Sequence, residues 1–185
     1  MCGIFALINN TFENPIIKEA FNKGRSRGPE YSNLCFGKVD ASVAFGFHRL
    51  AINGLDDISN QPLIYENCSL ICNGEIYNFR QLAKDMKIKL NTKSDCEIII
   101  HLYTKYGIAQ TLSMLDGVFA FVLMDYKKNA IYVARDPYGL RPLFIAKNDN
   151  QFFGFASLMK QLVKLDNSLD ISQFPPGNFL EFKGE

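Results

Sequence analysis

The chain of 185 residues contains no tryptophan, only two histidines and no excess of either charge, since 20 basic and 19 acidic residues leave a net charge of +1. A surface that neutralises nucleic-acid phosphates needs clustered Lys and Arg, so we expect no nucleic-acid partner. Long apolar runs are also missing. The longest run, residues 117–124, falls far short of the roughly 20 residues that cross a bilayer, so we expect no membrane partner.

Signals for secretion and for metal binding are weak. The apolar first eight residues have no preceding basic residue and no cleavage site, so we do not interpret them as a leader. Five cysteines, an odd number at irregular spacing, fit a reducing compartment, and we expect a cytoplasmic protein. Cys68 and Cys72 are predicted to pack in a strand. His48 and His101 have no second ligand at a suitable spacing, so no metal site is expected.

Aromatic and aliphatic residues are plentiful. Sixteen Phe and eight Tyr, with 48% hydrophobic residues, supply far more burial than a disordered chain carries. At about 150 residues per domain, this length predicts a single domain over residues 1–185.

Periodicity and turn residues predict mixed α and β structure. Asn14 and Pro15 are typical of a helix start, with Asn14 as N-cap, and Gly24 ends that helix. Residues 69–77 are expected to form a strand, a turn and the entry to a short helix that ends near Met86. The other expected strands are residues 1–7, 31–37, 42–50, 143–146, 152–156 and 178–182, and the other expected helices are 108–115 and 157–163.

Two segments carry the strongest structural signals. Residues 118–124 are apolar at every position, so both faces of that strand must be buried, and a short hairpin loop at 125–129 makes the next strand antiparallel. With several amphipathic helices, this predicts two stacked sheets between helical layers. Ser94 and Glu97 match a capping box before a helix whose apolar face is Ile98, Ile99, Leu102 and Tyr106, ended by Gly107.

Cys2 is the first candidate for chemistry. If Met1 is removed, the chain begins with a thiol and a free α-amine on one carbon. An α-amine has a pKa of about 7.7 to 8.0, so part of it can accept the thiol proton at neutral pH. The alternative is that Cys2 is a small buried apolar residue.

Asn73 and Gly74 form the second candidate, directly after an apolar strand. The Asn73 side-chain amide and the Gly74 backbone N–H could point at one spot, as an oxyanion hole requires. An Asn-Gly pair is also the commonest hairpin-turn signal, so a plain turn is the alternative.

Several motifs in fixed order extend this set. Together they resemble the class II glutamine amidotransferases, which are N-terminal nucleophile hydrolases, and are most like the glutaminase domain of the glutamine-hydrolysing asparagine synthetases. The resemblance covers nearly the whole chain. The motifs are Cys-Gly-Ile-Phe at 2–5, Arg-Gly-Pro at 27–29, His-Arg-Leu-Ala-Ile at 48–52, Asn-Gly-Glu-Ile-Tyr-Asn at 73–78, Ser-Asp-Cys-Glu at 94–97 and Arg-Asp-Pro-Tyr-Gly-Leu-Arg-Pro-Leu at 135–143.

The resemblance implies an α+β fold, a four-layer αββα sandwich of two antiparallel sheets. It implies that Cys2 attacks the side-chain amide of L-glutamine while its α-amine moves the proton to the leaving ammonia. Asn73 and Gly74 would hold the oxyanion. Arg49 would bind the substrate α-carboxylate through two parallel hydrogen bonds, a geometry that lysine cannot copy.

The same resemblance assigns the rest of the substrate pocket. Glu75 and Asp95 would receive the α-ammonium group, and the pocket would be lined by the backbone of Leu50, Ala51, Ile52 and Asn53. Read from the residues alone, Arg49 and Asp95 could instead form a surface ion pair or a helix cap. Residues 135–142 are interpreted as a structural turn whose shape is fixed by Gly139.

Departures from the family pattern are few. Glu30 stands where the family usually has Asp, and Leu158 replaces an acidic residue. No Ser-Gly-Gly loop for ATP is present, so we expect no synthetase (ATP pyrophosphatase) domain in this chain. No cofactor is expected for the glutaminase step, and ATP and Mg²⁺ would belong to a synthetase domain or subunit that accepts the ammonia. The alternative function is a non-catalytic module that binds glutamine or docks onto a partner.

Overall fold

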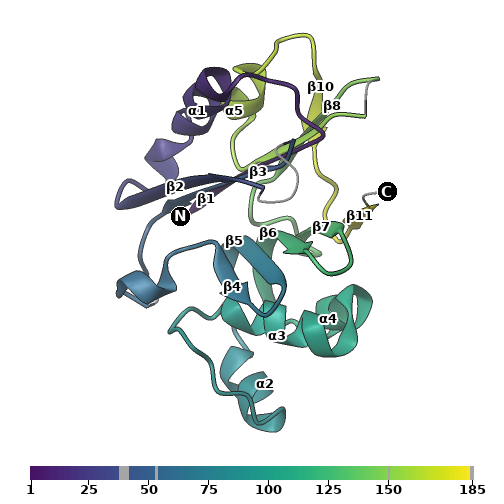
Figure 1. Ribbon diagram of the computed structural model, residues 1–185. Helices are drawn as coiled ribbons and strands as arrows, with labels where there is room; N and C mark the ends of the chain where they lie inside the picture. The colour runs from purple at the N-terminus through teal and green to yellow at the C-terminus, as the bar shows by residue number, and fades with distance from the viewer. Residues whose placement is uncertain (38–41, 53, 150, 184–185) are drawn as a thin grey trace.

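The computed structural model describes residues 1–37, 42–52, 54–149 and 151–183. Within these residues, two antiparallel sheets stack face to face, and helices cover the outer side of each sheet (Figure 1). This confirms the α+β class and the four-layer αββα sandwich.

Sheet A has the spatial order β10-β8-β9-β1-β3-β2, and sheet B has the order β11-β7-β6-β5-β4. The strands of sheet A are β1 (Gly3–Ile8), β2 (Tyr31–Phe36), β3 (Ala44–Arg49), β8 (Phe144–Lys147), β9 (Phe153–Ala156) and β10 (Asp170–Gln173). The strands of sheet B are β4 (Leu63–Tyr65), β5 (Cys68–Ile76), β6 (Gly117–Asp125), β7 (Ala130–Arg135) and β11 (Phe179–Lys183).

The helices divide between the two outer faces (Figure 1). Helices α1 (Asn14–Asn22) and α5 (Met159–Val163) pack against each other over sheet A. Helices α2 (Phe79–Asp85), α3 (Glu97–Tyr106) and α4 (Ile108–Met114) lie on the far side of sheet B. Two short 3₁₀ turns, η1 (Arg25–Arg27) and η2 (Asp57–Ser59), connect elements near one end of the sandwich.

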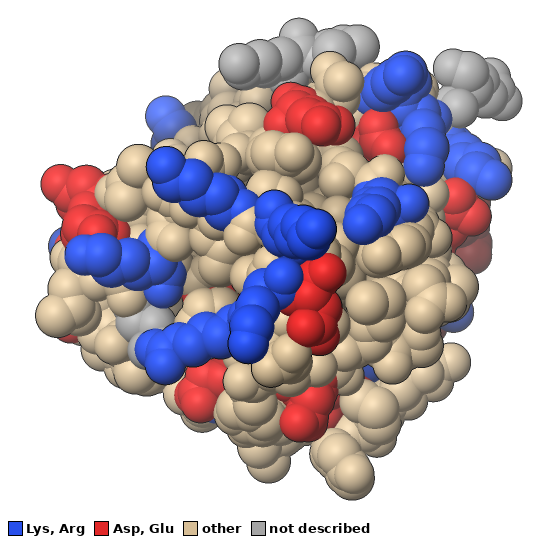
Figure 2. Space-filling model, turned by 90° about the horizontal axis from the view of Figure 1, so that it is seen from below, with Lys and Arg blue, Asp and Glu red and all other residues tan. Residues whose placement is uncertain are grey.

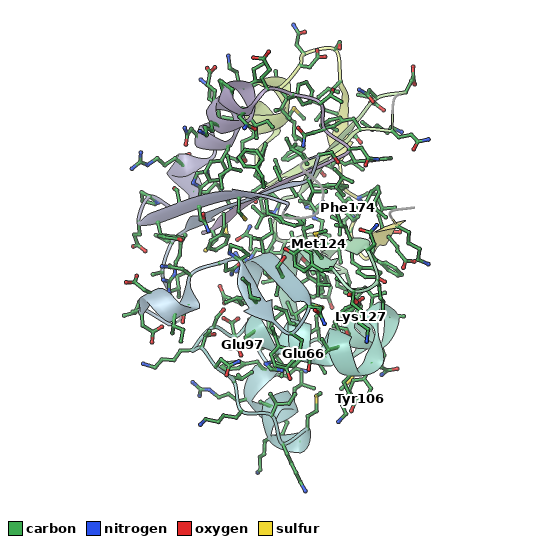
Figure 3. All side chains as sticks on the ribbon, viewed as in Figure 1. Glu66, Glu97, Tyr106, Met124, Lys127 and Phe174 are labelled. Carbon is green, nitrogen blue, oxygen red and sulfur yellow. The ribbon has the colours of Figure 1, made fainter. Side chains whose placement is uncertain are left out.

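Three apolar layers separate the four structural layers, and β6 belongs to two of them. Its Phe119, Phe121 and Leu123 face the helices of sheet B. Its Ala120, Val122 and Met124 face sheet A. Figure 3 shows Met124 and Phe174 in the region between the sheets. Both faces of this strand are therefore buried, which confirms the prediction from its uninterrupted apolar run.

Several other local predictions are confirmed. The loop at 125–129 joins β6 and β7 as an antiparallel hairpin. Gly107 ends α3 with a φ of 78°, a left-handed conformation that glycine adopts at little cost. The first helix begins at Asn14 itself with Glu13 as its N-cap, one residue earlier than predicted. Cys68 and Cys72 are buried in the core between sheet B and its helices, as predicted.

The turn predicted at Asn73 and Gly74 is wrong. Both residues lie inside β5, which pairs with β6 without interruption from Cys68 opposite Asp125 to Ile76 opposite Gly117. This long ladder outweighs the local turn preference. A Cβ at Gly74 would approach the Val118 carbonyl oxygen to 2.7 Å, so glycine is needed here for close strand packing and not for a turn.

The capping box at Ser94 and Glu97 is also wrong. The helix begins at Glu97, Cys96 is its N-cap, and no side chain caps it. The Glu97 carboxylate turns back to the preceding loop and accepts hydrogen bonds from the backbone N–H groups of Asn91 (2.7 Å) and Thr92 (2.6 Å). The predicted apolar face is buried at Ile98, Ile99 and Leu102, whereas Tyr106 at the helix end is 43% exposed.

Two strands have no counterpart among the predictions. β4 and β10 are three and four residues long and lie at sheet edges. β4 is too short to show the alternation that marks a half-buried strand, and three of the four β10 side chains are exposed. Their pairing partners define them as strands.

The surface carries interspersed charges. On the face seen from below in Figure 2, acidic side chains lie among the basic ones, in keeping with the nearly equal numbers of each. Over the ranges that the structure describes, no helix is long and apolar enough to cross a membrane.

We predict that Glu97→Gln lowers the free energy of unfolding at neutral pH by about 1.5–3 kcal/mol, the scale of hydrogen bonds to a charged group. Burial alone would raise the pKa of Glu97, but hydrogen bonds from Thr92, Asn91 and His101 outweigh it and hold the pKa below its ordinary value. The difference in free energy of unfolding between the wild type and Glu97→Gln is therefore complete above pH of about 4.3. It is lost as the pH falls through the lower pKa that Glu97 has in the folded state.

Chemical denaturation at several pH values measures this difference. Glu19→Gln, which alters an exposed carboxylate paired with Lys164, is the matched control and should change stability by less than about 1 kcal/mol. A Glu97→Gln deficit that stays constant down to pH 2 contradicts the assignment.

Candidate active site

A cleft opens where the start of β1 meets the ends of β3 and β5. Gly3 pairs with His48, so Cys2 lies beside the last residue of β3, Arg49. The fold thus brings together residues from five separate motifs. The lining includes Met1, Cys2, Phe47, Arg49, Leu50, Ile52, Ser59, Gln61, Cys72, Asn73, Gly74, Glu75, Ser94, Asp95, Cys96 and Arg141.

Cys2 is half-buried against the chain that follows β3. Its Sγ lies 3.4 Å from both the backbone nitrogen and the carbonyl oxygen of Leu50. The Arg27 Nε donates to the Cys2 carbonyl at 3.1 Å and fixes the main chain there. Burial raises the pKa of the Cys2 thiol, although the Leu50 N–H and the N-terminal charge oppose the effect. The resting group at neutral pH is a thiol, which needs a base before it can attack.

The Arg-Gly-Pro segment holds the end of β3 in place. A Cβ on Gly28 would lie 2.3 Å from the Arg49 carbonyl carbon, so only glycine permits this approach. The next residues bridge to the same strand, since the Glu30 N–H donates to the Arg49 carbonyl at 3.3 Å. The Glu30 carboxylate then accepts the Ala51 N–H at 2.5 Å. Glu30 thus fixes the segment that the sequence predicted to line the pocket.

One edge of β5 faces the cleft. Cys72 exchanges its backbone hydrogen bonds with Gln61 and not with β6, so its N–H and C=O point away from β6. In an antiparallel ladder these directions repeat every second residue, and Gly74 therefore points its N–H and C=O to the same edge. Phe119, which lies opposite Gly74 on β6, is consistent with this direction, because its own N–H and C=O bond to Asp136 and not to Gly74.

Side chains supply hydrogen-bond partners for most backbone groups along this edge of β5. The Gly74 carbonyl accepts from Cys96 Sγ at 3.8 Å, and the Ile76 N–H donates to Asp95 Oδ2 at 2.7 Å. These contacts leave the Gly74 N–H as the donor that faces the cleft.

Asn73 supplies a second donor. Its neighbour Ile71 points into the core between the sheets, and Asn73, two residues on, points the same way, toward the layer against which Cys2 packs. The side chain is 2% exposed, yet its Nδ2 has no hydrogen-bond partner among the described residues. A buried donor left unpaired costs about 1–3 kcal/mol, which marks it as a group held ready for a ligand.

Arg49 is 6% exposed and belongs to none of the ion pairs found among the described residues. Its guanidinium donates to the Asn60 side-chain oxygen at 2.6 Å, to the Asp56 carbonyl at 3.1 Å and to the Gly54 carbonyl. The surface ion pair considered from the sequence is therefore excluded for the described part of the chain. Neutral oxygens hold the cation at the cleft with its charge not neutralised.

Asp95 and Glu75 bring negative charge to the same cleft. Asp95 is 5% exposed, and its carboxylate binds the β5 edge at Ile76. Glu75 Oε1 forms an ion pair of 2.7 Å with Arg141 Nη2. The cleft thus combines two cations and two anions, a pattern that suits a zwitterionic ligand.

The turn at 135–142 has a wider role than predicted. Its shape is fixed as expected, because buried Arg135 binds the carbonyls of Gly139 and Arg141 and Gly139 has a φ of 62°. The last arginine, however, lines the cleft, where Arg141 Nη1 lies 2.5 Å from the Met1 sulfur. The second Arg of the Arg-Asp-Pro motif is the sequence signal for this residue.

The structure describes most of the segment whose backbone was predicted to line the pocket. Leu50 and Ile52 line the cleft, Ala51 binds Glu30, and Asn53 lies outside the described residues. Arg27, Gln61 and Arg141 contribute to the site without a role assigned from the sequence. Over the described ranges, no group of three His, Cys, Asp or Glu side chains is arranged to hold a metal ion.

Comparisons with known proteins agree with this geometry. A family model described as a glutamine amidotransferase domain matches residues 1–183. The glutamine-hydrolysing asparagine synthetases of Gallus gallus and Homo sapiens are 38% and 39% identical over 97% of this chain. The chain spans about a third (33%) of the length of these relatives.

Solved structures show the same fold. A glutamine phosphoribosylpyrophosphate amidotransferase from B. subtilis superposes with a TM-score of 0.82 and 25% identity, covering 98% of this chain and 47% of that one. A class II domain protein from Silicibacter pomeroyi superposes with a TM-score of 0.59 at 12% identity, covering 97% of this chain and 94% of that one. With a family match over almost every residue, the chain belongs to the glutamine amidotransferase domain family.

Proposed function

We propose that this chain hydrolyses the side-chain amide of L-glutamine to L-glutamate and ammonia through a thioester on Cys2. The observation that carries the proposal is the convergence of three groups on one cleft. These are the Cys2 thiol, the Asn73 Nδ2, which has no hydrogen-bond partner among the described residues, and the Gly74 N–H on the open edge of β5.

Opposed charges orient the substrate. The Arg49 guanidinium binds the α-carboxylate in two parallel hydrogen bonds, as its planar fork allows. Asp95 and Glu75 face the α-ammonium group. Glu75 also pairs with Arg141, which holds its carboxylate at the cleft. With both α-groups held, the side-chain amide extends toward Cys2.

Removal of Met1 exposes the α-amine that the reaction needs. The Met1 side chain lies in the cleft beside Arg141, so its loss also opens space for the substrate. The free amine takes the proton of the Cys2 thiol, directly or through a water, and the sulfur attacks the amide carbon. The amine then gives the proton to the departing nitrogen, which leaves as ammonia.

Negative charge develops on the substrate oxygen during the attack. The Asn73 Nδ2 and the Gly74 N–H donate hydrogen bonds to this oxygen, and each such donor contributes about 100- to 1,000-fold in rate. Water then attacks the glutamyl thioester and releases glutamate and the Cys2 thiol. The same donors stabilise the second oxyanion.

The ammonia is proposed to pass to a synthetase domain or subunit that would carry the ATP and Mg²⁺ chemistry. This proposal is supported by the printed names of the longer relatives, which are asparagine synthetases that hydrolyse glutamine. A cytoplasmic location is proposed because all five cysteines are free thiols, as a reducing compartment favours.

A non-catalytic module is the less favoured function. A site that only held glutamine would not need a thiol beside its amide donor, whereas Cys2 and Asn73 line the same cleft.

We predict that Cys2→Ala abolishes ammonia release from L-glutamine and leaves the fold intact, because no other described thiol lies beside a chain-terminal amine. Ammonia production and circular dichroism measure the two properties. Cys35→Ala, which removes another half-buried thiol on β2, should keep full activity. Intact mass must first show that Met1 is absent. Wild-type turnover by Cys2→Ala would remove the nucleophile from this account.

We predict that Arg49→Lys raises KM for L-glutamine by about thirtyfold, equivalent to roughly 2 kcal/mol, with a much smaller change in kcat. Lysine keeps the charge but loses the two-point contact with the carboxylate. Steady-state kinetics measure the split between the two constants. Arg80→Lys on α2, where the guanidinium stacks on Phe79, is the control. An unchanged KM for Arg49→Lys argues against its contact with the substrate.

A further inference from the structure

The side chain of Gln61 replaces a strand beside the oxyanion donors. Its Nε2 donates to the Cys72 carbonyl at 3.1 Å, and its Oε1 accepts the Cys72 N–H at 2.6 Å. Two opposed main-chain residues exchange such a pair of bonds in an antiparallel ladder. Here one side-chain amide makes both bonds, and Gln61 is only 6% exposed.

The register explains why Gln61 reaches this position. β4 pairs with β5 through Leu63 opposite Leu70, Ile64 opposite Ser69 and Tyr65 opposite Cys68. Extending that register places position 61 opposite Cys72. The main-chain ladder stops at Leu63, and Gln61 continues it by one further pair through its side chain.

This added pair lies next to both proposed oxyanion donors. Cys72 directly precedes Asn73, whose amide enters the space near Cys2. Gly74 lies on the same edge, midway between Cys72, which Gln61 holds, and Ile76, which Asp95 holds. The direction of the Gly74 N–H therefore depends on two side-chain contacts that flank it.

We propose that Gln61 is a positioning residue that fixes the cleft-facing edge of β5, so that Asn73 and Gly74 point at the substrate oxygen. Both polar atoms of its amide bond to Cys72, so the role assigned to Gln61 is exerted through the main chain. The inference rests on the proposed glutaminase function and assigns to it a residue outside the charged pocket.

The test uses Gln61→Met, which keeps an unbranched side chain of similar length and removes both hydrogen bonds. Three quantities are measured on the processed protein. The first is the rate at which L-glutamine forms the glutamyl adduct on Cys2, followed by rapid quench and intact mass. The second is the inhibition constant of the product L-glutamate, and the third is the rate of Cys2 alkylation by iodoacetamide.

The rate of adduct formation and kcat should fall by roughly tenfold to a hundredfold, the scale of a misplaced or lost oxyanion donor. The inhibition constant of L-glutamate should stay within about twofold, because glutamate binding depends on the α-group contacts. Iodoacetamide alkylation should also stay within about twofold, because displacement of iodide creates no charge on a carbonyl oxygen. Gln81→Met, which removes an exposed contact with Asp85 on α2, should match the wild type in all three.

Three results would overturn the proposal. These are unchanged adduct formation in Gln61→Met, a parallel loss of glutamate binding, and a parallel loss of alkylation. If Gln61→Met does not fold, Gln61→Asn, one carbon too short to make both bonds, takes its place with the same measurements. Failure of both variants to fold would make Gln61 a structural residue only. Absence of glutamine hydrolysis by the wild type would instead refute the proposed function.

Discussion

The site depends on the half-paired state of β5. Along one edge this strand is bound to β6 over its full length, while on the other edge β4 covers only its first residues. Every backbone group on the remaining edge needs a partner, because an unpaired buried polar group is costly. Gln61 and the adjacent pair Asp95 and Cys96 supply partners from two different segments. The Gly74 N–H is the donor left facing the cleft.

The stacking of the sheets brings a reactive group to that donor. β1 begins beside the end of β3, and both strands contact β5 across the apolar layer between the sheets. The chain terminus, with Cys2, therefore reaches the same end of the sandwich as Asn73. Burial keeps Cys2 as a thiol at rest, so an adjacent amine is the natural base for its activation. The position of Cys2 near Asn73 and the amine beside its thiol thus both support Cys2 as the nucleophile.

Much of the fold was predictable because its signals are local. The apolar run of β6, the hairpin after it and the glycine after α3 each depend on residues close in sequence, and all three predictions are confirmed. Edge strand β4 was missed because it has only three residues, and β10 was missed because most of its side chains face solvent. The capping box failed because Glu97 binds the loop before the helix and not the helix start.

The sequence by itself determined the kinds of chemistry available: a thiol next to the terminus, an amide beside a glycine, one arginine and two carboxylates in motifs of fixed order. Only the tertiary structure decided that Asn73 and Gly74 lie in a strand, that Glu75 pairs with Arg141, and that Gln61 completes the edge of β5. The physical reason is that these contacts depend on which strand edges remain unpaired. That property belongs to the packing of distant segments, and no local pattern of residues encodes it.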